Sequence, residues 1–488
     1  MLFNSFEYAF FFPAVAAGYF LLPHRVRWAW LLAASYLFYM AWKPGYLALL
    51  LVSTLVNYAA GLGMDAARGK GVRRAWLLLS LTVSLGLLFL FKYYAFFGAQ
   101  VRPLTEWLGW PPLLPEARWV LPVGISFYTF QTLSYTLEVY WRRQAPERHL
   151  GRFALYVAFF PQLVAGPIER AQRLLPQLAA RHDFDYGRVT DGLKLMVWGL
   201  FQKVVIADRL APMVNQVYGA PEQYNGPVLT FATVLFAYQI YCDFAGYTNI
   251  ALGTAQVFGM RLMENFRRPY FAVSTADFWR RWHISLSTWF RDYLYIPLGG
   301  NQVAWRRWTV NILVVFLLSG LWHGAAWTFV LWGMLHGIYL IAGRTLAPIR
   351  GRVAEAAGLL RHRALLRVLQ TSTTFVLVCF AWIFFRAASI GDAWTVVARL
   401  GTGWSALLTP SAFADTRVLF GVWPRDVVFA VLLIVFLECV HLLQARGPIR
   451  ERLRAQPLPL RWLVYSAGLW AIFMFGVLKQ QEFIYFVF

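Results

Sequence analysis

One histidine stands out because of its place in the chain. His323 lies between Gly320 and Gly324 in the long apolar stretch Leu318-Ser-Gly-Leu-Trp-His-Gly-Ala-Ala-Trp327. A polar side chain is costly to hold in such a stretch, so its presence there points to chemistry. Neutral histidine can take a proton from a hydroxyl near physiological pH, and the glycines leave room for another backbone or a substrate. We predict that His323 is a base reachable from within a membrane.

A second histidine, His283, lies in a polar and aromatic segment. The start Ser274-Thr-Ala-Asp277 resembles a capping box, and it predicts one helix that ends at Pro297, Gly299 and Gly300. Trp279, His283, Leu286 and Phe290 would share one stripe of this helix, and Arg280, Ser287 and Arg291 another.

Two interpretations of this amphipathic, basic helix stay open. It could lie flat at a membrane surface, as most such helices do. Alternatively, His283 could line a pocket for an acyl-carrying cofactor or carrier, with nearby arginines receiving its phosphates.

Asp243 is a third candidate. Gln239 and Gly246 fall on the same helical face, which Tyr247 and Ile250 extend, and we expect this face to point inward. Ion pairing is the common fate of an acid within a membrane. We therefore favour a structural carboxylate over direct catalysis, paired with Arg267, Arg268 or Arg281.

The remaining histidines give weaker signals. His24, His149, His182 and His362 lie in connectors, and His441 ends an apolar span, where we expect it to be solvated. His336 follows His323 by thirteen residues, so on one continuous helix the two would be roughly 20 Å apart and could not form one site.

The three cysteines and the absence of several motifs exclude other classes. Cys242, Cys379 and Cys439 lie far apart in apolar segments, which fits neither a disulfide framework nor a metal site, so we interpret all three as buried packing residues. The chain has no Gly-x-Ser-x-Gly elbow, phosphate-binding loop, dinucleotide-binding glycine pattern or zinc motif. Hydrolase, ATPase and metalloenzyme functions are therefore disfavoured, and we expect no metal.

The amino-acid composition predicts that most of the chain is surrounded by lipid. The 488 residues are 59% hydrophobic and 14% charged, which predicts a polytopic membrane protein. Stretches 46–63, 75–91 and 462–478 carry no charge and approach the roughly 20 residues that cross a bilayer as a helix. The N-terminus has no basic region or cleavage site typical of a signal peptide, so we expect it to form the first span.

Charge predicts the orientation. The formal net charge of +22 would suggest nucleic acid in a soluble chain, but here the basic residues lie in short runs between apolar spans. The positive-inside rule places these runs in the cytoplasm, so we expect no nucleic-acid partner. Both termini would then be extracytoplasmic. We expect a single domain over residues 1–488 with about eleven membrane-embedded segments, some re-entrant or broken.

Five motifs in order carry a family resemblance. They are Tyr241-Cys-Asp-Phe-Ala-Gly-Tyr-Thr-Asn-Ile-Ala-Leu-Gly253, Asn265-Phe-Arg-Arg-Pro-Tyr270, Asp277-Phe-Trp-Arg-Arg-Trp-His-Ile-Ser-Leu-Ser287, Asp292-Tyr-Leu-Tyr-Ile-Pro-Leu-Gly-Gly300 and Trp322-His-Gly324. Together they resemble the membrane-bound O-acyltransferase family, and most closely its bacterial branch that acetylates alginate, other exopolysaccharides or peptidoglycan. Motifs 122–128, 162–167 and 483–488 extend the resemblance over nearly the whole chain.

The resemblance implies an all-α bowl of tilted and broken helices around a central tunnel, with a functional core at about 120–345. His323 matches the family's essential histidine, and His283 its second, branch-characteristic histidine. The supporting or tunnel residues would be Asp243, Gln239, Tyr241, Trp322, Arg281 and Ser285. The donor-binding residues would be Arg267, Arg268, Arg280 and Arg291.

The implied reaction moves an acetyl group from a cytoplasmic thioester, acetyl-CoA or another acyl thioester, toward an exported polysaccharide. It implies a location in the bacterial inner membrane and a separate extracytoplasmic, esterase-like acetyltransferase partner. Two alternatives remain: a D-alanyl transferase for teichoic acid, and a transporter or flippase in which His323 relays protons. Whether His323 is a base or a transient acyl carrier also stays open.

Overall fold

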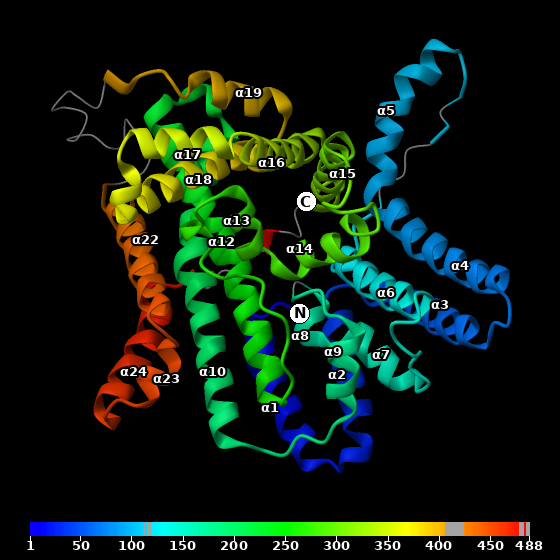
Figure 1. The fold of residues 1–488 in the computed structure, drawn as a ribbon. Coiled ribbons are helices and arrows are strands. Elements are labelled where there is room, and N and C mark those ends of the chain that lie inside the picture. Colours follow the sequence, from blue (N-terminus) through cyan, green and yellow to red (C-terminus); the bar gives the residue numbers. More distant parts are fainter. Residues whose placement is uncertain (112, 115–118, 165, 406–423, 478–482, 485–488) are drawn as a thin grey trace. The chain divides into compact units, whose positions relative to one another are not determined.

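The chain is folded into helices (Figure 1). The computed structural model describes residues 1–111, 113–114, 119–164, 166–405, 424–477 and 483–484, and these contain no β-strand. The all-α fold class predicted from the sequence is thus confirmed. Three parts of the predicted segments lie outside the described residues: residue 478 of the apolar stretch 462–478, residue 165 of motif 162–167, and residues 485–488 of motif 483–488.

The described residues form two compact units. Unit 1 comprises residues 1–196, 247–264 and 291–293, and unit 2 comprises 197–246, 265–290 and 294–488. The helices of unit 1 are α1 (Phe6–Leu21), α2 (His24–Met40), η1 (Pro44–Tyr46), α3 (Leu47–Ala66), α4 (Lys70–Leu88), η2 (Phe89–Tyr93), α5 (Tyr94–Trp107), α6 (Ile125–Tyr140), α7 (Leu150–Ala158), α8 (Phe160–Leu163) and α9 (Ala171–Ala179).

Three helices contribute residues to both units: α10 (Tyr186–Leu200), α12 (Gly226–Val257) and η6 (Arg291–Tyr295). Those of unit 2 alone are η3 (Phe201–Ala207), α11 (Asp208–Gly219), η4 (Pro221–Gln223), η5 (Pro269–Phe271), α13 (Thr275–Arg281), α14 (Ile284–Phe290), α15 (Trp305–His323), α16 (Trp327–Thr345), α17 (Ala347–Ala356), η7 (Leu359–Arg361), α18 (Arg363–Arg386), α19 (Ile390–Arg399), α22 (Pro424–Ala445), α23 (Ile449–Arg454) and α24 (Leu458–Phe475).

Six helices of the described residues are long and apolar enough to cross a membrane, and a seventh if the bent pair α16–α17 counts as one span. They are Pro44–Ala66, Lys70–Trp107, Gly226–Val257, Arg363–Arg386, Pro424–Ala445 and Leu458–Phe475. A polytopic membrane protein is confirmed. The expected number of about eleven segments is higher because several apolar runs fold into shorter helices, among them the 16-residue helices α1 and α6.

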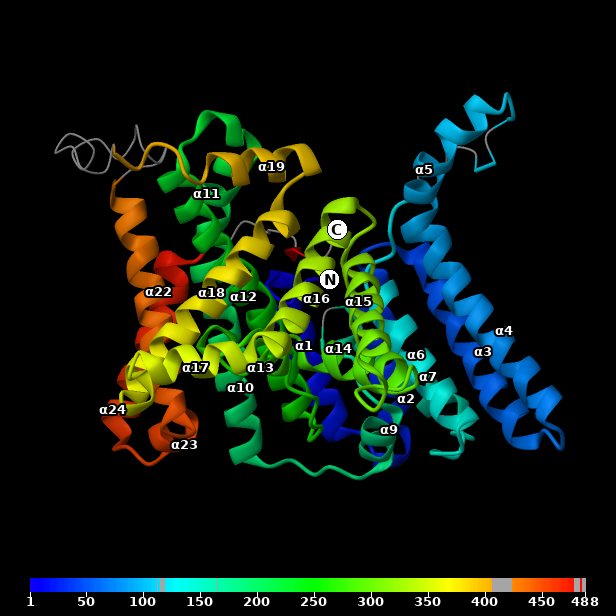
Figure 2. The ribbon, with the colours of Figure 1, turned by 45° about the horizontal axis from the view of Figure 1, so that its top comes forward.

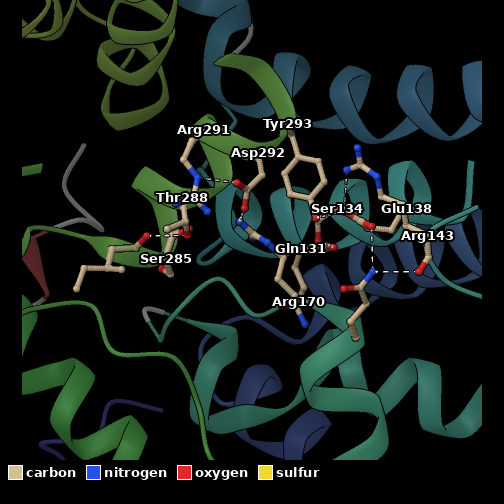
Figure 3. A network of polar contacts seen from close by, with 12 residues as sticks. Gln131, Ser134, Glu138, Arg143, Arg170, Ser285, Thr288, Arg291, Asp292 and Tyr293 are labelled. Atoms are coloured by element: carbon tan, nitrogen blue, oxygen red, sulfur yellow. Dashed lines mark hydrogen bonds and ion pairs between the residues drawn. The ribbon is translucent and has the colours of Figure 1, made fainter. Parts of the chain in front are cut away.

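In unit 1, a polar network ties the short connector 291–293 to α6 (Figure 3). The Tyr293 hydroxyl donates to Glu138 at 2.9 Å, and Arg170 lies 3.9 Å from Asp292. The Arg170 guanidinium also lies 4.9 Å from the centre of the Tyr293 ring, whose other neighbour Trp141 is stacked at 5.9 Å. Charge pairing and ring stacking therefore hold this connector in place.

In unit 2, α15 and α16 pack side by side (Figures 1 and 2). Their backbones approach closely at glycines: a Cβ on Gly320 would overlap the Phe329 carbonyl, and one on Gly333 would overlap the Phe316 carbonyl. The glycine beside His323 thus admits another backbone, one of the two possibilities given by the sequence. Small residues at such crossings are typical of membrane helices.

A turn at Gly324–Ala326 separates α15 from α16. The expectation that His323 and His336 lie on one helix is therefore wrong. The Trp332 ring lies 4.9 Å from the His323 ring and 5.0 Å from that of His336, so both histidines contact one tryptophan. Gly324 was the signal for this break, since glycine often follows the last residue of a helix; no proline or charge marks it.

A buried ion cluster crosses the core of unit 2. The Lys203 ammonium donates to Asp208 at 2.8 Å and to Asp243, and all three side chains are at most 4% exposed. Lys203 and Asp208 are five residues apart, and the π-helical turn η3 brings that spacing onto one face. Asp243 also accepts from the backbone amide of Ile484 at 2.8 Å.

This cluster corrects one prediction. Asp243 is an ion-paired carboxylate, as we favoured from the sequence, but its partner is Lys203 and not Arg267, Arg268 or Arg281. Arg281 instead donates to Asp277 at 3.0 Å.

A methyl group at the α15–α16 contact should destabilise the fold. Gly333→Ala places Cβ against the Phe316 carbonyl, and such overpacking costs about 1–3 kcal/mol. Gly343→Ala on the same helix is the matched control, because its nearest neighbour is the Thr275 hydroxyl at 3.8 Å. Thermal unfolding of the purified protein should show a lower midpoint for Gly333→Ala alone. Equal midpoints would contradict the close contact.

Removal of the central charge should cost more than removal of the whole cluster. Lys203→Met leaves two carboxylates buried without their cation, and we expect a loss of about 3–5 kcal/mol. The triple variant Lys203→Met, Asp208→Asn, Asp243→Asn removes the charges together and should regain much of the loss. Midpoints of thermal unfolding compare the two, and a triple variant less stable than the single one would refute the ion cluster.

Candidate active site

The segment that carries His283 is two helices instead of one. α13 ends at Arg281, α14 begins at Ile284, and His283 between them has a φ of +42°. The prediction of a single helix from Ser274 is therefore wrong in its middle, although its start is right: the Ser274 hydroxyl accepts from the Asp277 amide at 3.1 Å, and Asp277 accepts from the Val273 amide at 3.2 Å.

Asn265 explains the break. Its backbone carbonyl accepts from the Ile284 amide at 3.0 Å, and its side-chain oxygen accepts from the amide and the hydroxyl of Ser285 at 3.3 and 2.7 Å. These bonds satisfy donors at the start of α14, where a helix leaves its first amides without partners. Because Asn265 is some twenty residues upstream, the local pattern of apolar residues could not reveal it.

His323 is the last residue of α15. The turn begins at Gly324, whose amide donates back to Gly320 at 3.2 Å. Aromatic rings surround the imidazole: those of Trp322, Trp332 and Phe385 lie 5.0, 4.9 and 5.5 Å away between ring centres. The residue is 2% exposed, so bulk water does not compete for its ring nitrogens.

The two histidines meet. Their ring centres are 6.2 Å apart, at an interplanar angle of 62°, and the Trp322 ring contacts both. Phe244 packs on His283, and the two ring centres are 4.7 Å apart. Two buried imidazoles at this separation can act on neighbouring atoms of one substrate, one as a base and the other as a hydrogen-bond donor.

The predicted supporting residues lie around this pair to different degrees. Trp322 contacts both rings, Ser285 follows His283 by two residues and is bonded to Asn265, and Asp243 precedes Phe244, which packs on His283. Tyr241 lies farther along α12, with its ring 6.2 Å from Trp282 and its hydroxyl 3.0 Å from His441. Gln239, on the same helix, is buried.

The predicted donor-binding arginines, and the predicted supporting residue Arg281, differ in their contacts and their exposure. Arg280 and Arg281 both pair with Asp277, at 3.8 and 3.0 Å, and the Arg280 side chain is 73% exposed. Arg268 has a φ of +48°, and Arg267 is exposed. Arg291 pairs with Asp292 in unit 1.

Several residues around the site escaped sequence reasoning. His441 is buried between Tyr241 and Glu438, at 3.0 and 3.3 Å, so the expectation that it is solvated is wrong. Cys439 is exposed, whereas Cys242 and Cys379 are buried as expected. Lys203 had a visible signal, since it is a lone lysine in the apolar run 201–207 with an aspartate five residues later.

Comparison with known proteins gives the family. Residues 142–354 match the model of the membrane-bound O-acyltransferase family. The chain is 39% identical to a probable alginate O-acetylase of Azotobacter vinelandii, over 82% of this chain and 78% of that protein. It is 34% identical to a peptidoglycan O-acetyltransferase of Helicobacter pylori, over 81% and 79%.

A more distant relative is a teichoic acid D-alanyltransferase of Bacillus subtilis, 28% identical over 50% of this chain and 65% of that protein. The match to the O-acetylating relatives thus extends over far more of the chain at higher identity. Sequence similarity of that extent, together with the helical membrane fold, shows that the chain is an O-acyltransferase and belongs to the membrane-bound O-acyltransferase family.

Proposed function

We propose that this enzyme transfers an acetyl group from an acyl thioester, acetyl-CoA or a related donor, toward an exported polysaccharide of the alginate or peptidoglycan type. The observation that carries the proposal is the buried pair His283 and His323, which share the Trp322 wall. The names of the relatives support the acetyl group and the polysaccharide. Similarity to the D-alanyltransferase is weaker, and membership of an enzyme family argues against a transporter.

The proposed chemistry assigns one role to each histidine. A ring nitrogen of His323 takes the proton of an acceptor hydroxyl while the hydroxyl oxygen attacks the thioester carbonyl. His283 donates a hydrogen bond to the oxyanion that forms. When the carbon–sulfur bond breaks, the thiolate leaves and takes the proton back from His323. A variant of this scheme has His323 carry the acetyl group before the acceptor does.

The membrane setting follows from the same proposal. The donor approaches from the cytoplasm and the acceptor from the other side of a bacterial inner membrane, through a tunnel that reaches His323. The basic connectors face the cytoplasm and both termini lie outside. A separate extracytoplasmic acetyltransferase then places the group on the polymer. Residues 1–488 act as one domain in this proposal.

The His323 side chain should be required for transfer. In membranes that contain this protein together with its extracytoplasmic partner and the polysaccharide acceptor, supplied with radiolabelled acetyl-CoA, His323→Ala should lower the rate of label transfer by about 10²–10⁴-fold, the range for a lost general base. His362→Ala is the control, because His362 is exposed. A His323→Ala enzyme as active as the control would refute the proposed base, and label transfer absent even from the wild type would refute the donor.

Two substitutions at position 283 can separate an effect on folding from an effect on the transfer reaction. Asparagine tolerates the left-handed conformation, whereas a β-branched residue does not. His283→Asn should therefore fold like the wild type and lose most of its transfer activity. His283→Val should lose both its wild-type stability and its transfer activity. Thermal midpoints and label transfer, measured on the same preparations, give the two readouts. An active His283→Asn enzyme would exclude the imidazole from the reaction.

A further inference from the structure

Unit 1 contains a cavity with a basic wall. Its volume is about 240 Å³, and its lining includes His24, Arg25, Arg27, His149 and Arg152. The other lining residues are aromatic or aliphatic, with Trp28 and Tyr19 the largest, and the lining contains no aspartate or glutamate. The three arginines around this cavity produce a positive potential there that attracts anions.

Two helix starts build this wall. His24 and Arg25 begin α2, and His149 is the N-cap of α7, where its Nδ1 accepts from the Arg152 amide at 3.1 Å. The partial positive charge of the α7 N-terminus adds to that of the side chains. Trp28 of α2 packs against the start of α7. Its ring centre lies 4.8 Å from that of His149, and the ring leaves room only for glycine at position 151.

The arginines of the cavity differ in how many partners they have within the protein. The Arg27 guanidinium donates to the carbonyls of Leu22 and His182 at 2.9 and 2.6 Å, so its role is structural. Arg152 pairs with Glu147 at 3.5 Å, but its Nε is buried without a hydrogen-bond partner within the described residues. Arg25 is exposed. Arg25 and Arg152 are therefore the side chains available to a ligand.

We propose that this cavity binds the phosphate group of an anionic ligand. Two guanidinium groups can each give paired hydrogen bonds to phosphate oxygens, a geometry that arginine matches better than lysine does. Two sources share this chemistry: the headgroup of an anionic phospholipid, and the phosphates of a coenzyme A thioester. The second source rests on the proposed function, whereas the first does not.

The test compares two ligands on one pair of variants. Native mass spectrometry of the full-length protein in detergent measures binding of dioleoylphosphatidylglycerol against dioleoylphosphatidylcholine, and separately binding of coenzyme A. The double variant Arg25→Gln, Arg152→Gln should weaken binding of the cognate phosphate ligand at least tenfold, because each lost charge-assisted bond is worth about that factor. The control is Arg148→Gln. Arg148 is the exposed neighbour of His149 in the sequence, pairs with Asp65 and is not part of the cavity lining.

Each outcome is decisive. A loss for phosphatidylglycerol alone assigns the cavity to lipid, and a loss for coenzyme A alone assigns it to the donor. Equal binding by wild type, double variant and control, or no binding of either ligand by wild type, overturns the proposal. If the double variant aggregates, Arg25→Gln alone replaces it, because that exposed side chain is not needed for packing. Loss of acetyl transfer with both ligands still bound would count against the proposed function and leave this site intact.

Discussion

The Lys203 ion cluster is the constraint on which unit 2, the unit that contains His283 and His323, depends. A lysine and two aspartates at most 4% exposed are stable only when each satisfies the others, since an isolated charge in an apolar interior is far too costly. Through these bonds η3, α11, α12 and the chain near Ile484 are held at one point. Phe244, the neighbour of Asp243, then meets His283, so the position of the second imidazole depends on a charge balance several residues away.

The two histidines are held in contrasting ways. His323 ends a helix whose partner helix α16 lies so close that glycines are required, which leaves its backbone little freedom. His283 has a strained backbone conformation between two short helices. The hydrogen bonds that Asn265 accepts from Ser285 stabilise this conformation. Rigid packing places one imidazole and a polar cap places the other. Both arrangements keep the rings at a fixed separation while excluding water.

Sequence reasoning found the residue types but not always their partners. His323, His283 and Trp322 could be singled out because a polar group in an apolar run is rare and its cost is local, and the structure brings their rings together. The break at His283 and the pairing of Asp243 were missed, because each depends on a residue distant in the chain: Asn265 and Lys203. The helical class followed from composition alone, whereas the number of spans required the lengths of the folded helices.

The bond between Asp243 and the Ile484 amide joins positions 241 residues apart. During translation, Lys203, Asp208 and Asp243 leave the ribosome long before residue 484 does. Until the ribosome reaches that point, Asp243 therefore lacks this amide as a hydrogen-bond donor. The full set of bonds around Lys203 is thus completed only when residue 484 has been synthesised.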